Sequence, residues 1–352
     1  MVKRIFQGVG LLVVLALGVI AVSVIRFDKT KEELLPKYGQ APSQFIELAS
    51  GAVAHVRDQG NQAGPVLVLV HGSNASLHTW EPWVSELGGT YRVVTLDMPG
   101  HGLTGAVPGD DYSRGAMVAF THEVAGKLGL TQYAIGGNSM GGGVALQYAQ
   151  DYPAEVDALI LVDAAGLPRK MDPNAKVPLG FRIARMPVIN KVFQYVAPRG
   201  MYEEGVRKVF VDQSVVTDEM IDRYFDLNLY QGNRKATGLR FALPFNDTDV
   251  ADKISSMTVP TLILWGDKDG LIPVENAYEF GKRIKGSKVV VYENVGHIPM
   301  EEVATRSAGD VAAFLAGVNA AKASPVAPDA VPDATEEAAG AEGGQEAPSS
   351  SQ

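Results

Sequence analysis

Ser139 stands in a glycine-rich run, residues 136–142, that reads G-G-N-S-M-G-G. An apolar segment, residues 132–135, precedes the run, and a helix-compatible segment, residues 144–150, follows it. A G-x-S-x-G sequence between a strand and a helix forces the serine into a strained, exposed turn, which the flanking glycines permit because they carry no side chain. The pattern therefore predicts that the Ser139 hydroxyl acts as a nucleophile.

A serine nucleophile needs a base and a carboxylate, and the chain offers both after predicted strands. A serine hydroxyl is a weak nucleophile near neutral pH, so an imidazole must accept its proton and a carboxylate must orient that imidazole. Residues 294–300, N-V-G-H-I-P-M, follow the last predicted strand and supply His297. We predict that His297 is the base.

The acid has three candidates. Residues 264–269, L-W-G-D-K-D, end a predicted strand with Asp267 and Asp269. Asp269 is the predicted acid, since the loop must carry the carboxylate past the strand end, and Asp267 is expected to cap the turn through an Asx-type bond. Asp163, at the end of another predicted strand, is the alternative acid.

An oxyanion hole is expected beside the serine. The backbone amide of Ser73, in the segment V-H-G-S-N at residues 70–74, would pair with the amide of Met140. Two such donors stabilise the negative charge that an attacked carbonyl oxygen acquires. His71 is expected to be buried and hydrogen-bonded for structural reasons.

The elements that must position these residues alternate along the chain. Continuous apolar runs at residues 66–70, 93–96, 158–162, 262–265 and 289–292 predict strands buried on both faces, as in a parallel sheet. Helix-compatible stretches lie between them, which indicates an α/β fold. Active sites of such sheets lie at the carboxyl ends of the strands.

Other segments have a different character. Residues 28–44 are charged and contain proline, as expected of a linker. Residues 167–251 interrupt the alternation of strands and helices and predict a helical cap, with a capped amphipathic helix at 217–225. Core segments are expected at 45–166 and 252–319. Residues 320–352 contain almost no large apolar residue, which predicts disorder.

Composition excludes several kinds of function. The 352-residue chain is 46% hydrophobic, carries a formal net charge of −9 and has no cysteine. The negative charge argues against a nucleic-acid partner, and the lack of cysteine excludes disulfides, thiol catalysis and cysteine metal sites. The chemistry sketched above needs neither metal nor cofactor.

The amino terminus predicts membrane attachment. Lys3 and Arg4 precede an uncharged stretch, residues 5–25, that is long enough to span a bilayer as a helix. We expect residues 1–27 to anchor the protein, with the catalytic domain on the extracytoplasmic side. The alternative is a signal peptide cleaved after residues 21–23, A-V-S, which would release a periplasmic or secreted protein.

From residue 45 to about residue 315 the chain resembles the α/β-hydrolase superfamily, on the serine turn, the acid, the base and the H-G segment together. The resemblance implies an eight-stranded, mostly parallel sheet flanked by helices, and the chain order serine, acid, histidine. His297 is the only one of the six histidines that follows Ser139. Residues 96–102, L-D-M-P-G-H-G, look like the superfamily's turn after the fourth strand, where His101 would not be catalytic.

Two subgroups of the superfamily are similar to this chain. The resemblance to membrane-anchored monoacylglycerol lipases and bacterial carboxylesterases implies that this chain hydrolyses lipophilic esters. The serine turn is also typical of carbon–carbon bond hydrolases that cleave meta-cleavage products, although those enzymes usually have tryptophan where Ile298 stands. A cofactor-free haloperoxidase would use the same triad, and a non-catalytic ligand-binding protein is the remaining alternative.

Overall fold

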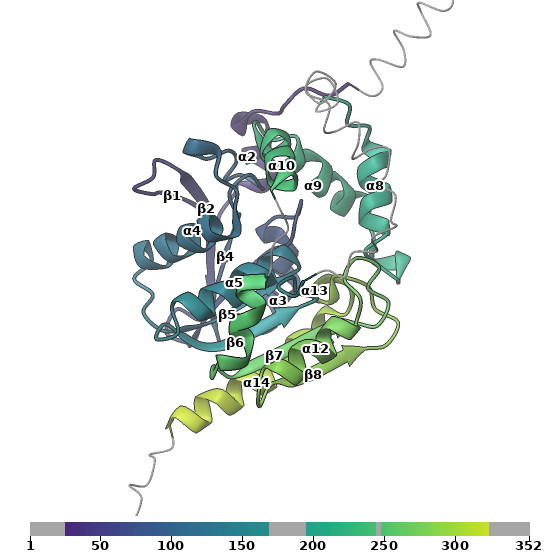
Figure 1. Ribbon diagram of the computed structural model, residues 1–352. Coiled ribbons are helices and arrows are strands. Elements are labelled where there is room, and N and C mark those ends of the chain that lie inside the picture. The colour runs from purple at the N-terminus through teal and green to yellow at the C-terminus, as the bar shows by residue number, and fades with distance from the viewer. Residues whose placement is uncertain (1–24, 169–194, 244–247, 324–352) are drawn as a thin grey trace, which may run out of the picture.

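The computed structural model describes residues 25–168, 195–243 and 248–323. An eight-stranded sheet in the order β1-β2-β4-β3-β5-β6-β7-β8 forms its centre (Figure 1). β2 is antiparallel to β1 and β4, and all other neighbours are parallel, as predicted. The strands are β1 (Ser43–Glu47), β2 (Val53–Gly60), β3 (Val66–Val70), β4 (Arg92–Leu96), β5 (Tyr133–Asn138), β6 (Val156–Val162), β7 (Thr261–Gly266) and β8 (Lys288–Tyr292).

The central strands are apolar throughout because helices cover both faces of the sheet. In β3, Val68 and Val70 belong to the core on one face, whereas Leu67 and Leu69 belong to the core on the other. Successive side chains of a strand point to opposite faces, so a continuous apolar run fills both cores. This arrangement fixes where each strand ends and hence where its following loop begins.

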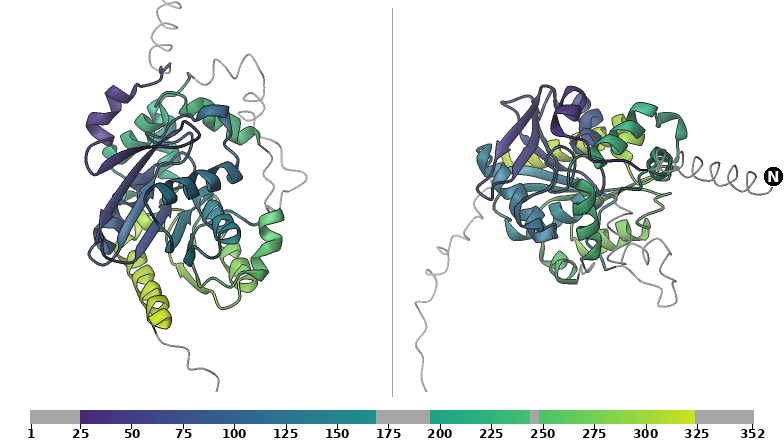
Figure 2. Two further views of the ribbon diagram at one scale, coloured as in Figure 1. Left: turned by 90° about the vertical axis from the view of Figure 1, so that its left-hand side faces the viewer. Right: turned by 90° about the horizontal axis from the view of Figure 1, so that it is seen from above.

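Helices lie on both sides of the sheet (Figure 2). One face packs against α4 (Arg114–Lys127), α5 (Met140–Asp151), α11 (Thr248–Lys253) and α12 (Glu275–Arg283), and the other against α3 (Glu81–Leu87) and α14 (Ala304–Ala323). The short helix α13 (Pro299–Glu302) precedes α14.

Between β6 and β7 the chain forms the helices α8 (Arg199–Arg207), α9 (Asp218–Asn228) and α10 (Asn233–Ala242), which we call the cap. These helices lie together beyond one end of the sheet (Figure 1). The expected capped helix is α9: the side chain of Thr217 accepts a hydrogen bond of 3.2 Å from the amide of Met220. The cap therefore faces the loops that follow the strands.

Residues 28–44 are not a plain linker. They contain the helix α2 (Lys31–Tyr38), which begins with a reciprocal capping box between Thr30 and Glu33. The side chains of Leu34 and Tyr38 are buried, and the Tyr38 hydroxyl donates to Asp226 of the cap at 2.9 Å. Charged residues that suggested a linker are the exposed face of this helix.

The predicted anchor at residues 1–27 falls almost wholly outside the described residues, as do residues 169–194 of the predicted cap. Among the helices that the structure describes, none combines the length and apolar content needed to cross a membrane. At the other end, α14 extends to Ala323, so residues 320–323 of the predicted disordered tail are helical. Residues 324–352 lie outside the description.

Candidate active site

Ser139 occupies a strained turn between β5 and α5. Its backbone has φ 54° and ψ −118°, a conformation that costs a residue with a side chain about 1–3 kcal/mol. Neighbouring strands hold it there: the amide of Ser139 donates to Val162 at 3.0 Å, and the amide of Ala165 donates to Ser139 at 2.9 Å. Gly141 is essential to the turn, because a Cβ atom there would lie 2.2 Å from the carbonyl oxygen of Val70.

His297 and Asp269 form a buried hydrogen-bonded pair. Nδ1 of His297 lies 2.7 Å from Oδ2 of Asp269, and both side chains are almost fully shielded from solvent. Oδ1 of Asp269 accepts the amides of Leu271 at 2.7 Å and Ile272 at 3.0 Å, which fixes the carboxylate. The imidazole is thus oriented through Nδ1, while Nε2 has no hydrogen-bond partner among the described residues.

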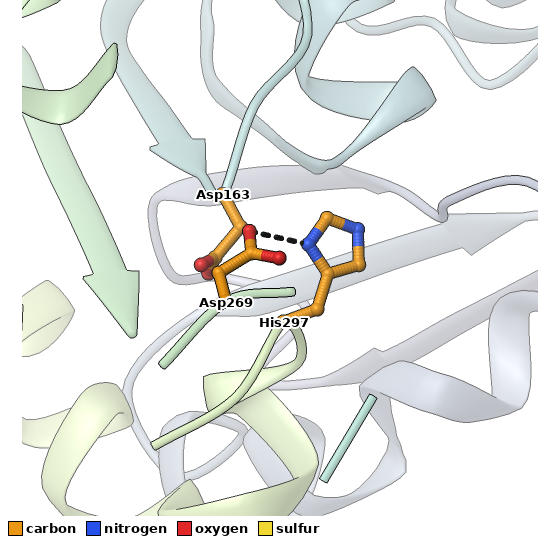
Figure 3. A group of neighbouring side chains, drawn as sticks. All are labelled: Asp163, Asp269 and His297. Carbon is orange, nitrogen blue, oxygen red and sulfur yellow. Dashed lines mark hydrogen bonds and ion pairs between the residues drawn. The ribbon is translucent and has the colours of Figure 1, made fainter. Parts of the chain in front are cut away.

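Asp163, the alternative acid, lies beside this pair rather than in place of Asp269. Figure 3 shows the carboxylates of Asp163 and Asp269 on the same side of the His297 ring, with the interaction drawn to Asp269. Burial, together with the charge of Asp269, raises the pKa of Asp163 well above its ordinary value. Oδ1 of Asp163 accepts the amide of Gly266 at 3.0 Å.

Asp267 differs from its predicted role. The Asx-type bond to the residue two positions later is made by Asp269, through the amide of Leu271, and not by Asp267. Oδ2 of Asp267 instead lies 2.7 Å from Nζ of Lys268. Asp269 therefore makes both the turn bond and the predicted contact with His297.

A metal ion is a conceivable occupant of this cluster. The ligand atoms of Asp163, Asp269 and His297 all lie within 4.8 Å of one another. However, Nδ1 of His297 already faces Asp269, and Oδ1 of Asp163 already accepts a backbone amide. These contacts fit a carboxylate–imidazole pair better than a coordination shell.

Hydrogen bonds join the serine turn to the histidine loop. Nδ2 of Asn138 donates to the carbonyl oxygen of His297 at 3.0 Å, and also to that of Val162 at 3.2 Å. The amide of His297 donates to the carbonyl oxygen of Val209, in the segment after α8, at 2.9 Å. The Ser139 hydroxyl itself is not hydrogen-bonded to His297 in this structure; such bonds often form only with substrate present.

Glu302 is a positioning residue that the sequence did not indicate. Its Oε2 accepts the amide of Gly296 at 2.8 Å, next to His297. Its Oε1 accepts the amides of Val211 at 2.9 Å and Asp212 at 2.7 Å. One buried carboxylate therefore links the histidine loop to the cap, through residues about 90 positions apart.

Of the predicted oxyanion residues, Ser73 lies on the loop after β3 and Met140 is the first residue of α5. The hydroxyl of Ser73 donates to Sδ of Met140 at 3.8 Å, so the two residues are in contact. Gly72 keeps the loop close to the nucleophile, since a Cβ atom at this position would lie 3.2 Å from Cβ of Ser139. Nη1 of Arg240, from the cap helix α10, donates to the hydroxyl of Ser73.

His71 and His101 are structural. Nδ1 of His71 donates to the carbonyl oxygen of Gly72 at 2.7 Å, while Nε2 accepts the amide of Met98 at 3.0 Å, which requires the neutral ring. Burial lowers the pKa of His71, and lowers that of His101 further. Nδ1 of His101 donates to the carbonyl oxygen of Pro99 at 3.0 Å. Both rings brace the loops around the site.

Comparison with protein families and with known proteins finds matches to hydrolases. The family model for the alpha/beta hydrolase fold matches residues 65–303. Lipase 1 of Psychrobacter immobilis is 28% identical over 298 residues, covering 83% of this chain and 87% of the lipase. A 2-hydroxy-6-oxo-2,4-heptadienoate hydrolase of Pseudomonas putida is 29% identical over 262 residues, covering 71% of this chain and 88% of that hydrolase.

Among solved structures, a bacterial membrane phospholipase A superimposes with a TM-score of 0.65. It is 26% identical, and the match covers 90% of this chain and 99% of the phospholipase. The structural similarity therefore includes the helices as well as the sheet. The matched proteins have names that indicate different substrates.

Proposed function

This chain belongs to the alpha/beta hydrolase fold family, and we propose that it is a serine hydrolase that cleaves carboxylic esters of lipophilic acyl groups, such as monoacylglycerols. The buried Asp269–His297 pair, tied to the strained turn at Ser139, carries this proposal. The similarity of the chain to lipases supports the same proposal.

The proposed reaction proceeds through an acyl-enzyme. Nε2 of His297 takes the proton of the Ser139 hydroxyl as the oxygen attacks the ester carbonyl, and the amides of Ser73 and Met140 hold the resulting oxyanion. His297 then gives its proton to the leaving alcohol. Water, deprotonated by His297, attacks the acyl-enzyme and releases the carboxylic acid, which restores Ser139.

A Ser139→Ala variant tests this scheme. We expect the full-length protein to hydrolyse p-nitrophenyl esters and monoacylglycerols, and the variant to lose about 10⁴-fold or more in kcat because no acyl-enzyme forms. Ser256→Ala is the matched control, since it removes an exposed hydroxyl that lies outside the site. Full turnover by Ser139→Ala would refute the scheme.

A carbon–carbon bond hydrolase is the second candidate, favoured by the similarity to the Pseudomonas putida enzyme. The same nucleophile would serve a 2-hydroxy-6-oxo-dienoate substrate. Ser139-dependent loss of the dienoate absorbance, without ester hydrolysis, would select this alternative. Membrane attachment through the first residues of the chain stays a prediction.

A further inference from the structure

Arg240 is a buried arginine that has no carboxylate partner in the part of the chain that the structure describes. It lies near the end of α10, is only 9% exposed, and donates through Nη1 to the hydroxyl of Ser73. The shielded arginines Arg92 and Arg223, in contrast, pair with Asp58 and Glu301. An uncompensated buried charge is strongly unfavourable.

The unused atoms of Arg240 form one edge of its guanidinium group. Nε and Nη2 are both buried and have no hydrogen-bond partner among the described residues. These two donors point side by side, which is the geometry that binds two oxygens of a carboxylate or phosphate. The ring of Phe241, 4.5 Å from the guanidinium carbon, offers a cation–π contact but no acceptor.

Among the described residues around Arg240, no carboxylate is paired with it. His71 and His101, whose pKa values its charge helps to lower, are neutral. Burial lowers the pKa of Arg240 itself to about 10, so the group remains charged near neutral pH. Buried charges in proteins are ordinarily paired, and a buried cation without a counter-ion departs from this rule. Such departures are expected at ligand-binding sites.

We propose that Arg240 binds an anionic group of the substrate, a phosphate or a carboxylate, next to the oxyanion hole. Arg240 bonds Ser73, and Ser73 contacts Met140, so the bound anion lies close to the scissile ester. This inference rests on the proposed ester hydrolysis and adds a preference for esters that carry a phosphate or a carboxylate. The Nε–Nη2 edge, shielded in this structure, must open to admit the anion.

Binding to the inactive full-length Ser139→Ala protein tests the proposal without turnover. Calorimetry would compare 1-octanoylglycerol 3-phosphate with 1-octanoylglycerol, and hydrogen p-nitrophenyl adipate with its neutral methyl ester. We expect at least one anionic ligand to bind about 10- to 100-fold more tightly than its neutral counterpart, and Arg240→Gln to abolish that ratio. The pair that shows the preference identifies phosphate or carboxylate as the recognised group.

The matched control is Arg234→Gln, because Arg234 lies in the same helix and is already paired with Asp28. This variant should keep the ratio. Equal binding of anionic and neutral ligands in both pairs, or a ratio unchanged by Arg240→Gln, would overturn the proposal and leave Arg240 as a brace for the Ser73 loop.

Turnover by the protein with Ser139 intact separates this inference from the function on which it rests. Hydrolysis of the neutral esters without a preference for the anionic ones would reject the role of Arg240 alone. Arg240-dependent binding of an anionic ligand without any hydrolysis would reject the esterase function and retain the anion site.

Discussion

At the scale of single residues, two neighbouring carboxyl groups have different contacts. Asp269 accepts two backbone amides and faces the imidazole of His297. Asp163 is fully buried, and burial together with the charge of Asp269 raises its pKa well above the ordinary value. One site thus contains a carboxyl group that orients the imidazole and a second, buried carboxyl group that accepts a backbone amide instead.

Replacing each acid by its amide should distinguish their roles. We expect Asp269→Asn to lower kcat by about 10³- to 10⁴-fold, because the amide no longer stabilises the protonated imidazole or selects the required tautomer. Asp163→Asn changes a group that is not hydrogen-bonded to the imidazole and keeps an acceptor oxygen for the amide of Gly266, so it should cost less than about tenfold. Steady-state kinetics on one ester measures both values, and an equal loss in the two variants would contradict the assignment of Asp269.

The sequence indicates the reactive residues better than it indicates their supports. Ser139 and His297 have local signals, a glycine-rich turn and a position after the last strand. Arg240 and Glu302 have none, because their contacts join segments that are 167 and about 90 residues apart. Whether Asp267 or Asp269 faces the imidazole depends on the path of the loop after β7, which the sequence pattern does not specify.

At the scale of elements, the histidine loop is held between the sheet and the cap. Glu302, at the end of α13, accepts amides from both sides, and Asn138 ties the same loop to the serine turn. The bonds of Glu302 are made to backbone amides and that of Asn138 to a backbone carbonyl oxygen, so they fix the path of the chain and not only a side chain. The position of His297 therefore depends on the cap as well as on β8.

Glu302→Gln should loosen this junction. The amide retains only one acceptor oxygen for three backbone donors, and we expect a loss of about 1–3 kcal/mol in the free energy of unfolding. If the loop positions His297, kcat should also fall about tenfold while KM stays nearly constant. Glu204→Gln, on the exposed face of α8, is the control. Unchanged kcat in a folded Glu302→Gln protein would mean that the junction is purely structural.

Element prediction succeeded where patterns are local. Runs such as Val66–Val70 are apolar because both faces are covered, and they became strands. The charged segment before β1 was expected to be a linker but contains the helix α2. Only Leu34 and Tyr38 of this helix are buried, and two apolar positions are too few to distinguish a short helix from an exposed linker in the sequence. Its stability comes from packing against the cap, which no local pattern encodes.

At the scale of the whole molecule, buried neutral histidines make the fold sensitive to acid. His78 is 7% exposed, and burial lowers its pKa to about 3. Nε2 of His78 lies 3.1 Å from the carbonyl oxygen of Tyr38 and donates to it, which links the core to α2. Unfolding lets this ring return to a pKa near 6.5 and bind a proton.

The sign of the effect follows from that difference. Stability from neutral His78 is complete above about pH 6.5 and falls as the pH decreases toward 3, by up to about 1.4 kcal/mol per pH unit. Denaturant unfolding at several pH values should show this slope, and His78→Gln should reduce it. The partly exposed His122, which pairs with Glu155 at the surface and is not enclosed in the core, is the comparison, and His122→Gln should reduce the slope less than His78→Gln does. An unaltered slope in His78→Gln would contradict the prediction.

The contacts of residues 25–30 have a consequence for how the protein would meet its substrate. Ile25 pairs with Val196, and Lys29 pairs with Tyr230 and forms an ion pair of 2.7 Å with Asp226, all on the cap side. Residue 25 therefore lies against the cap, so a partner bound through the predicted anchor would be joined to the protein on its cap side. If that partner is a bilayer, the search for substrate becomes two-dimensional, and orientation, not affinity for the membrane, determines how often an ester meets Ser139.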